Sequence, residues 1–135
     1  HMFKFFSILV SVLFLVSFSG CAEKTHVLEF SSQNAETSEW VATELNEDYL
    51  VSAKVQINDY YTPFISLKFN EEGAKLFEEV TEQNIGKPLG IFVKGELITA
   101  PIVNERITGG EAQIAGMFTL EEAENLAQNL NDSIP

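Results

Sequence analysis

The sequence predicts an α+β fold: a two-layer structure in which an antiparallel sheet carries two main helices on one face. Three observations predict it. Several short segments alternate between apolar and polar residues with a period of two, as half-buried strands do. Two longer segments, 70–86 and 119–130, instead place apolar residues at helical spacing. Along the chain the order is strands, helix, several strands, helix, and 135 residues suit one domain.

Four strands are predicted before the first helix, at 26–30, 40–45, 53–58 and 64–69. A loop rich in Ser, Asn, Gln and Glu, at 31–38, separates the first two, and Asn46-Glu47-Asp48 predicts a turn. The segments 53–58 and 64–69 alternate most regularly. Because the residues between them end in Pro63, the two segments predict a hairpin.

The sequence contains signals for both ends of the first helix. Asn70 is a favourable cap, and the acidic side chains of Glu71 and Glu72 follow it in the first turn, where the helix dipole stabilises negative charge. Gly86 ends the pattern, and Pro88 lies two residues beyond it. A helix is therefore expected to begin at residue 71 and to end before Gly86.

After this helix, residues 89–93 are apolar on both faces and predict a central strand. The chain turns at Lys94-Gly95 and returns over 96–98. Pro101 interrupts pairing, so the short strand expected at 102–107 would lie at a sheet edge or away from it. A last strand is expected at 112–116. Thr119 and Glu122 then form a capping box before the second helix.

The N-terminal segment predicts export. His1 is interpreted as a cloning remnant, Lys4 supplies a positive charge, and residues 5–16 are mostly apolar. Phe18-Ser19-Gly20-Cys21 resembles the lipobox of bacterial lipoproteins. The resemblance implies a signal peptide at 1–20, a lipidated Cys21 (acyl chains such as palmitate) with a short tether at 21–25, and one domain at 26–135. An uncleaved signal anchor and a secreted protein with a free thiol remain alternatives. All three place the domain outside the cytoplasm.

Composition excludes several classes of partner. The chain has 8 basic and 20 acidic residues, and its net charge of −12 repels nucleic acid and bare anionic lipid alike. An acyl anchor would hold so acidic a domain at a membrane without basic contacts. The one Cys excludes an internal disulfide and a cysteine zinc site. No cofactor beyond the covalent lipid is expected.

No constellation of residues predicts catalysis. His26 has no second imidazole beside it for a metal pair and is interpreted as a strand-end residue. The adjacent acid pairs on the predicted helices do not converge on one point, because neighbouring helical residues face apart. We therefore expect no enzyme, no catalytic residue and no metal. Trp40, Tyr60 and Tyr61 are aromatic residues at loops or strand ends, where such side chains favour contacts with protein partners. The alternative interpretation is that these three residues pack at the rim of the hydrophobic core.

The segment from Ile65 onward resembles the head subdomain of the first periplasmic domain of SecD, the export subunit of SecDF. The resemblance covers roughly 70 residues. Lys94 departs from it, since SecD usually has Asp in that turn. The matching runs are Ile65-Ser66-Leu67-Lys68-Phe69-Asn70-Glu71-Glu72-Gly73-Ala74-Lys75-Leu76-Phe77, Asn84-Ile85-Gly86-Lys87-Pro88-Leu89, Val93-Lys94-Gly95-Glu96-Leu97-Ile98-Thr99-Ala100-Pro101 and Ile107-Thr108-Gly109-Gly110-Glu111-Ala112-Gln113-Ile114.

The resemblance implies a free-standing SecD-head-like domain without catalytic residues, and it leads to two hypotheses. The first is a tethered binding module that contacts exported or envelope polypeptides through strand-edge backbone together with Trp40, Tyr60 and Tyr61, with SecDF among its possible partners. The second is a structural or regulatory lipoprotein that docks on one envelope complex. The sequence leaves the client, the oligomeric state and the membrane that carries the anchor open.

Overall fold

The computed structural model describes residues 25–135. The predicted leader at 1–20 and Cys21 lie outside the described residues. None of the helices in this part of the chain is long and apolar enough to span a bilayer. The elements, in chain order, are β1 (Leu28–Gln33), β2 (Trp40–Asn46), the 3-10 helix η1 (Glu47–Tyr49), β3 (Leu50–Ile57), β4 (Pro63–Phe69), α2 (Glu71–Gln83), β5 (Leu89–Val93), β6 (Glu96–Thr99), β7 (Glu111–Ala115) and α3 (Leu120–Asp132).

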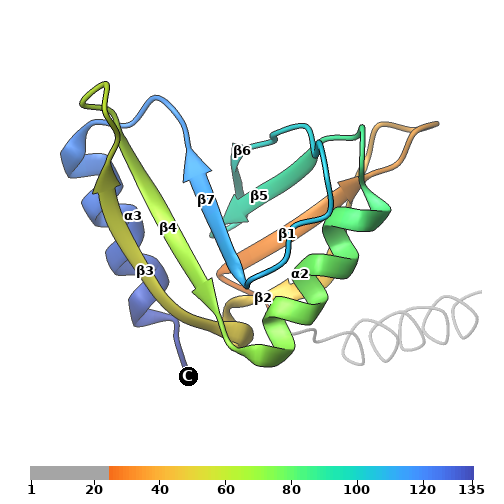
Figure 1. Ribbon diagram of the computed structural model, residues 1–135, viewed down its shortest axis with the longest axis horizontal. Helices are drawn as coiled ribbons and strands as arrows, with labels where there is room; N and C mark the ends of the chain where they lie inside the picture. The colour runs from red at the N-terminus through yellow and green to blue at the C-terminus, as the bar shows by residue number, and fades with distance from the viewer. Residues whose placement is uncertain (1–24) are drawn as a thin grey trace, which may run out of the picture.

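The strands form two antiparallel sheets (Figure 1). The four-stranded sheet has the order β2-β1-β5-β6, and the three-stranded sheet has the order β3-β4-β7. The α+β class and the antiparallel pairing are confirmed, as is the predicted β3–β4 hairpin, in which Val55 pairs with Ile65. The division into two sheets is not visible in the alternation of single strands, because β4 and β5 are separated by a helix and take different partners.

Each of the two main helices packs against its own set of strands. Helix α3 covers β3 and β4, and its buried residues are Ala123, Ala127 and Leu130. Helix α2 contacts β2 of one sheet and β4 of the other. The sequence predicted that both helices lie on one face of one sheet, and the structure refines this prediction. Since there are two sheets, α3 covers one of them while α2 contacts both.

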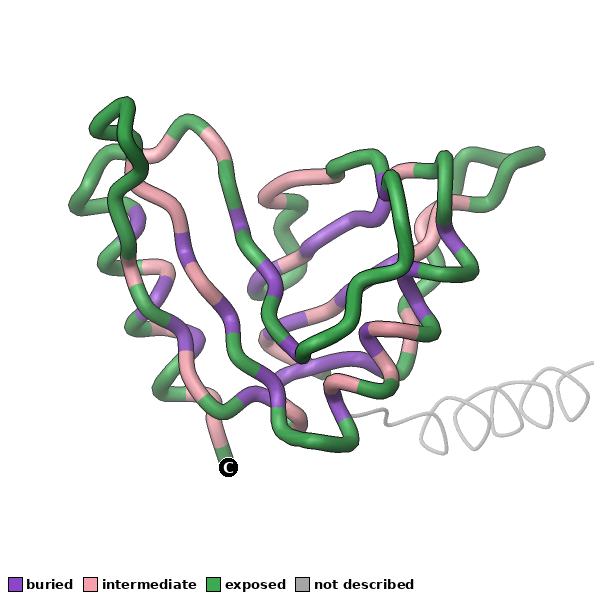
Figure 2. Tube along the Cα trace, in the orientation of Figure 1, coloured by how far each residue is buried: buried purple, intermediate pink, exposed green. Residues whose placement is uncertain are grey.

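The core is continuous between the two sheets. Phe30 of β1 lies edge-on to Phe69 of β4, with ring centroids 5.8 Å apart, and edge-on to Phe77 of α2, at 5.9 Å. Edge-to-face packing of this kind is favourable for aromatic rings. Figure 2 shows buried positions along β1 and β5 of one sheet and along β4 and β7 of the other, and along β7 buried and exposed residues alternate. One aromatic cluster therefore joins both sheets and α2.

Both predicted helix starts are confirmed. The Asn70 side chain accepts a hydrogen bond from the Gly73 N–H at 2.8 Å. At α3 the capping box forms in both directions: Thr119 Oγ1 accepts from the Glu122 N–H at 3.1 Å, and Glu122 Oε1 accepts from the Thr119 N–H at 3.0 Å. These bonds satisfy amide groups that a helix end leaves without partners.

Two segments differ from expectation. Strand β1 extends to Gln33, into the predicted loop, because Ser31 pairs with Ala42 on one side and with Gly90 on the other. The short strand predicted at 102–107 is wrong. This segment makes only isolated bridges, from Ile102 to Pro88 and from Val103 to Ile85, because Pro101 and the exposed polar residues after it keep it off the sheet.

Candidate functional site

The tip of the β3–β4 hairpin displays two aromatic side chains to solvent. Tyr60 is 86% exposed and Tyr61 is 90% exposed. In Figure 2 the loop is green throughout, at the end of β3 and β4 that projects farthest from the buried residues. Exposed aromatic rings are costly in water and are enriched where proteins meet partners. The structure thus places both tyrosines predicted as partner contacts at one exposed point.

The loop that carries the tyrosines is ordered by one residue. The Asn58 side-chain oxygen accepts from the Tyr60 N–H at 2.9 Å and from the Thr62 N–H at 3.0 Å. The Asn58 backbone adds a bond to Thr62 and a bond from Tyr61. Tyr61 has a φ of +61°, which is uncommon for a residue with a side chain. This network fixes the direction in which the two rings leave the loop.

Two further apolar side chains adjoin the tip. Ile57 ends β3 and is exposed, and Met117 is fully exposed. Because Ala115 of β7 pairs with Phe64 of β4, Met117 comes two residues after the point where β7 reaches the hairpin loop. We call Ile57, Tyr60, Tyr61 and Met117 the hairpin tip surface. Sequence reasoning missed both residues: Ile57 directly precedes the loop but belongs to a predicted strand, whereas the position of Met117 depends on the register of β7.

Trp40 does not belong to this surface. It begins β2, in the other sheet, and its ring lies edge-on to Phe92 with centroids 5.8 Å apart. Phe92 and Gly90 alternate with the buried residues Leu89, Ile91 and Val93, so Trp40 covers the outer face of the four-stranded sheet. Trp40 is half-buried there. The structure therefore separates Trp40 from Tyr60 and Tyr61.

His26 makes a structural contact at the opposite end of β3. Its Nδ1 lies 2.9 Å from Oε1 of Glu47, a buried carboxylate in η1, and that oxygen also accepts from the Val27 N–H at 2.8 Å. One ligand atom each from His26, Glu47 and Asp48 lies within 4.8 Å of the others. Since Glu47 is already bonded to two donors, these contacts fasten the start of β1 to η1.

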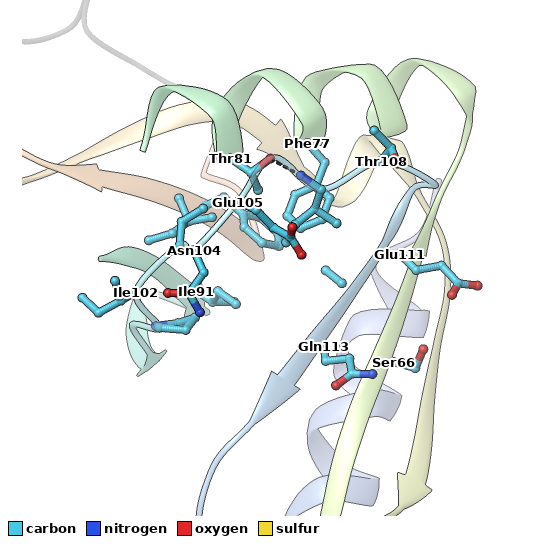
Figure 3. Close-up of a pocket in the computed structure, with 16 residues that line it drawn as sticks. Ser66, Phe77, Thr81, Ile91, Ile102, Asn104, Glu105, Thr108, Glu111 and Gln113 are labelled. Carbon is cyan, nitrogen blue, oxygen red and sulfur yellow. Dashed lines mark hydrogen bonds between the residues drawn. The ribbon is translucent and has the colours of Figure 1, made fainter. Parts of the chain in front are cut away.

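A cleft of about 540 Å³ lies between the two sheets, under the segment 101–108 (Figure 3). Ser66 and Gln113 form its wall on the three-stranded sheet. Ile91 and the segment residues Ile102 and Asn104 face them across the cleft. The lining is mixed, because polar side chains such as Gln113 and Asn104 stand on both walls beside aliphatic ones. Such a surface suits a polypeptide, whose backbone is polar and whose side chains vary.

The segment 101–108 is held in place although it forms no strand. The Ile107 N–H donates to Thr81 Oγ1 at 3.0 Å (Figure 3), and Arg106 pairs with Glu78 of α2 at 3.2 Å. The Val103 N–H donates to the Lys87 carbonyl at 3.0 Å. Pro101 is the one sequence signal for this wall, since it predicts a segment displaced from the sheet; the cleft itself follows from the arrangement of the two sheets.

Comparison with known proteins identifies relatives of this domain. The pattern of the family described as SecDF, P1 head subdomain, matches residues 25–134. The SecD protein translocase subunit of Calditerrivibrio nitroreducens is 48% identical over 84 residues, 62% of this chain and 16% of that protein. The SecDF subunit of Thermus thermophilus is 47% identical over 78 residues, 58% of this chain and 11% of that protein. The chain thus spans a small part of these relatives.

Solved structures agree with these matches. A structure of SecDF, a membrane component that enhances protein export, superposes with a TM-score of 0.74 at 32% identity, covering 82% of this chain and 64% of that one. SecDF in a super-membrane-facing form gives a TM-score of 0.73 at 33% identity, covering 82% of this chain and 19% of that one. The two sheets and two helices described above are therefore an arrangement shared with these proteins.

Proposed function

The chain belongs to the family of SecDF P1 head subdomains, and from this premise we propose that it binds exported or envelope polypeptides outside the cytoplasm while a lipid on Cys21 holds it at a membrane. It acts by binding and carries no catalytic residue. The observation that carries this proposal is the hairpin tip surface, where a side-chain network holds two exposed tyrosines outward.

The geometry of the domain supports this role. Cys21 precedes His26 by five residues, and His26 is bonded to Glu47 of η1, immediately before β3. Strand β3 has eight residues, which at about 3.3 Å each give a length of about 26 Å. A tether at Cys21 therefore joins the domain near one end of β3, and the hairpin tip surface lies at the other end. The exposed aromatic side chains therefore lie at the end of β3 opposite the anchored end, where polypeptides in the envelope can reach them.

In-cell photo-crosslinking tests this proposal. A photoreactive amino acid replaces Tyr61 in the full chain, and partners are identified by mass spectrometry from solubilised membranes. The control carries the same amino acid at Glu124, an exposed position on α3. Many exported proteins captured from position 61 would support the proposal. A single dominant envelope protein would favour the alternative, a structural or regulatory lipoprotein. Equal capture at both positions would contradict a contact at the tip.

A further inference from the structure

One edge of the three-stranded sheet is open. In an antiparallel ladder, residues bonded to the neighbouring strand alternate with residues whose N–H and C=O point the other way. The Phe69 N–H donates to the Gly110 carbonyl at 2.8 Å, so by alternation Ala112 and Ile114 of β7 bond to β4. The backbone groups of Glu111, Gln113 and Ala115 then point outward. Among the described residues, no strand pairs with this side of β7.

The same alternation applies at the opposite edge of this sheet, where one outward-facing residue is capped. Asn58 bonds to Thr62 across the hairpin, so the outward groups of β3 include those of Ala53. The side chain of Asn131 in α3 binds both of them: its oxygen accepts from the Ala53 N–H at 3.0 Å, and its nitrogen donates to the Ala53 carbonyl at 2.8 Å. The fold therefore caps β3 with a side chain and leaves β7 uncapped.

The open edge carries little of the usual protection against pairing, since Glu111 is the one charged residue of β7. Edge strands are normally shortened, bulged, or interrupted by proline or lysine. Strand β7 has the sequence Glu-Ala-Gln-Ile-Ala and pairs with β4 without a register shift. It also runs along both hollows of the surface: Glu111 and Gln113 line the cleft between the sheets, and Gln113 and Ala115 line a second hollow of about 440 Å³ that continues to the hairpin loop.

We propose that an extended, neutral or basic polypeptide segment adds to β7 as a fourth strand of this sheet. The inference rests on the proposed function and gives it a site and a binding mode. The outward groups of Glu111, Gln113 and Ala115 supply donors and acceptors for the segment's backbone, and alternate side chains of the segment enter the cleft. The charge of the chain, 20 acidic against 8 basic residues, favours such a segment over a second copy, which like charge repels.

A pair of peptides tests the binding mode. The first is a fluorescent peptide built from Val, Thr and Ser with lysine at each end; the second is identical but N-methylated at every backbone nitrogen between the lysines, so that neither of its edges can donate hydrogen bonds. Both are titrated into the full chain in detergent micelles, with anisotropy as the readout. Strand addition predicts that methylation weakens binding at least about tenfold, because it removes several hydrogen bonds at once. Equal affinity of the two peptides would overturn strand addition and leave polypeptide binding intact. No binding of either would count against both.

Variants of Gln113 localise the site. Gln113→Pro removes an outward N–H and keeps the bonds to β4, whereas Gln113→Ala removes only the side chain. We expect the proline variant to bind about tenfold more weakly than the alanine variant, because only the proline variant also loses the outward N–H, and we expect unchanged circular dichroism for both. Amide hydrogen exchange supplies a second readout that needs no variant: the peptide should slow exchange at Glu111, Gln113 and Ala115. Unchanged exchange there, or a dimer that forms through β7 in a dilution series, would overturn the assignment.

Discussion

At the scale of single residues, the contact between Trp40 and Gly90 shows how close packing holds a large aromatic side chain against a sheet. A Cβ atom added to Gly90 would lie 2.8 Å from Cζ3 of Trp40 and 3.0 Å from Cε1 of Phe92. Separations below about 3.4 Å are repulsive for carbon atoms. The indole can therefore lie against β5 at this point only because residue 90 has no side chain. This makes Trp40 a packing residue of the four-stranded sheet.

A first prediction follows for Gly90. Gly90→Ala should destabilise the domain by about 1–3 kcal/mol, because the new methyl group overpacks against the indole. The cost should fall when the same change is made in a Trp40→Leu background, since the clashing ring is then absent. Urea unfolding of the four proteins of this double-mutant cycle measures both effects. An equal cost in both backgrounds would show that the strain arises elsewhere.

At the scale of elements, the capping box of α3 couples stability to pH. Hydrogen bonds from the Thr119 backbone N–H and, next, from its side chain lower the pKa of Glu122 below its ordinary value. A lowered pKa in the folded state means that the charged form is stabilised by folding. The contribution is complete above the ordinary glutamate pKa, about 4.3, and is lost as the pH falls through the lowered value.

Two variants check this second prediction. Thr119→Ala should cost about 1 kcal/mol at neutral pH, because α3 loses its cap. Glu122→Gln should also be less stable than the parent at about pH 7, and the difference should shrink toward about pH 3, as a growing fraction of Glu122 becomes protonated. Urea unfolding at both pH values measures it. A difference between the parent and Glu122→Gln that stays constant down to about pH 3 would contradict the assigned hydrogen bonds.

The edge of β3 yields a third prediction. Asn131→Ala removes both bonds to the Ala53 backbone and should destabilise the domain by about 1–2 kcal/mol. It should also raise the tendency to aggregate, because a second strand edge becomes free to pair. Asn125→Ala is the matched control, at an exposed position of the same helix, and should change neither property. Thermal unfolding and light scattering distinguish the two variants.

The elements that could be read from the sequence are those with chemical signals at their ends. Both helices follow from Asn70 and from the Thr119–Glu122 pair, which act locally. The segment after Pro101 was wrongly predicted as a strand, because Ile102 and Val103 have the β-branched side chains typical of strands but take their few backbone partners from the turn after α2. The sequence did not predict that β1 continues through Ser31 for a similar reason. Pairing with β2 on one side and β5 on the other, rather than the type of side chain, keeps that residue extended.

At the scale of the whole molecule, Phe30 holds the two sheets together. It is fully buried and contacts the rings of Phe69 and Phe77, which belong to β4 and α2. Phe30→Ala should therefore cost about 3–5 kcal/mol, the range for a large cavity in a core. Phe92→Ala removes an identical side chain from the outer face and should cost clearly less. Similar losses for the two variants, measured by urea unfolding, would contradict a core shared between the sheets.

The candidate site was only partly accessible from the sequence. Tyr60 and Tyr61 could be selected because a turn signal surrounds two aromatic residues. Met117 could not, since it lies far from Tyr60 in the chain and only the pairing of β7 with β4 brings the end of β7 to the hairpin. The same holds for the cleft, whose walls come from both sheets and from the segment 101–108. A local pattern predicts an element, whereas a surface shared between elements depends on their register.

The central claim is that this domain binds unfolded polypeptide, and one measurement tests it directly. The full chain in detergent micelles is titrated into fluorescently labelled ribonuclease A, either native or reduced and blocked with a neutral reagent. The two forms have nearly the same charge, so a difference reports the state of the backbone rather than electrostatic attraction. The account predicts saturable binding of the unfolded form alone, weakened by joint replacement of Tyr60 and Tyr61 with serine. Equal binding of both forms, or binding of neither, would contradict it.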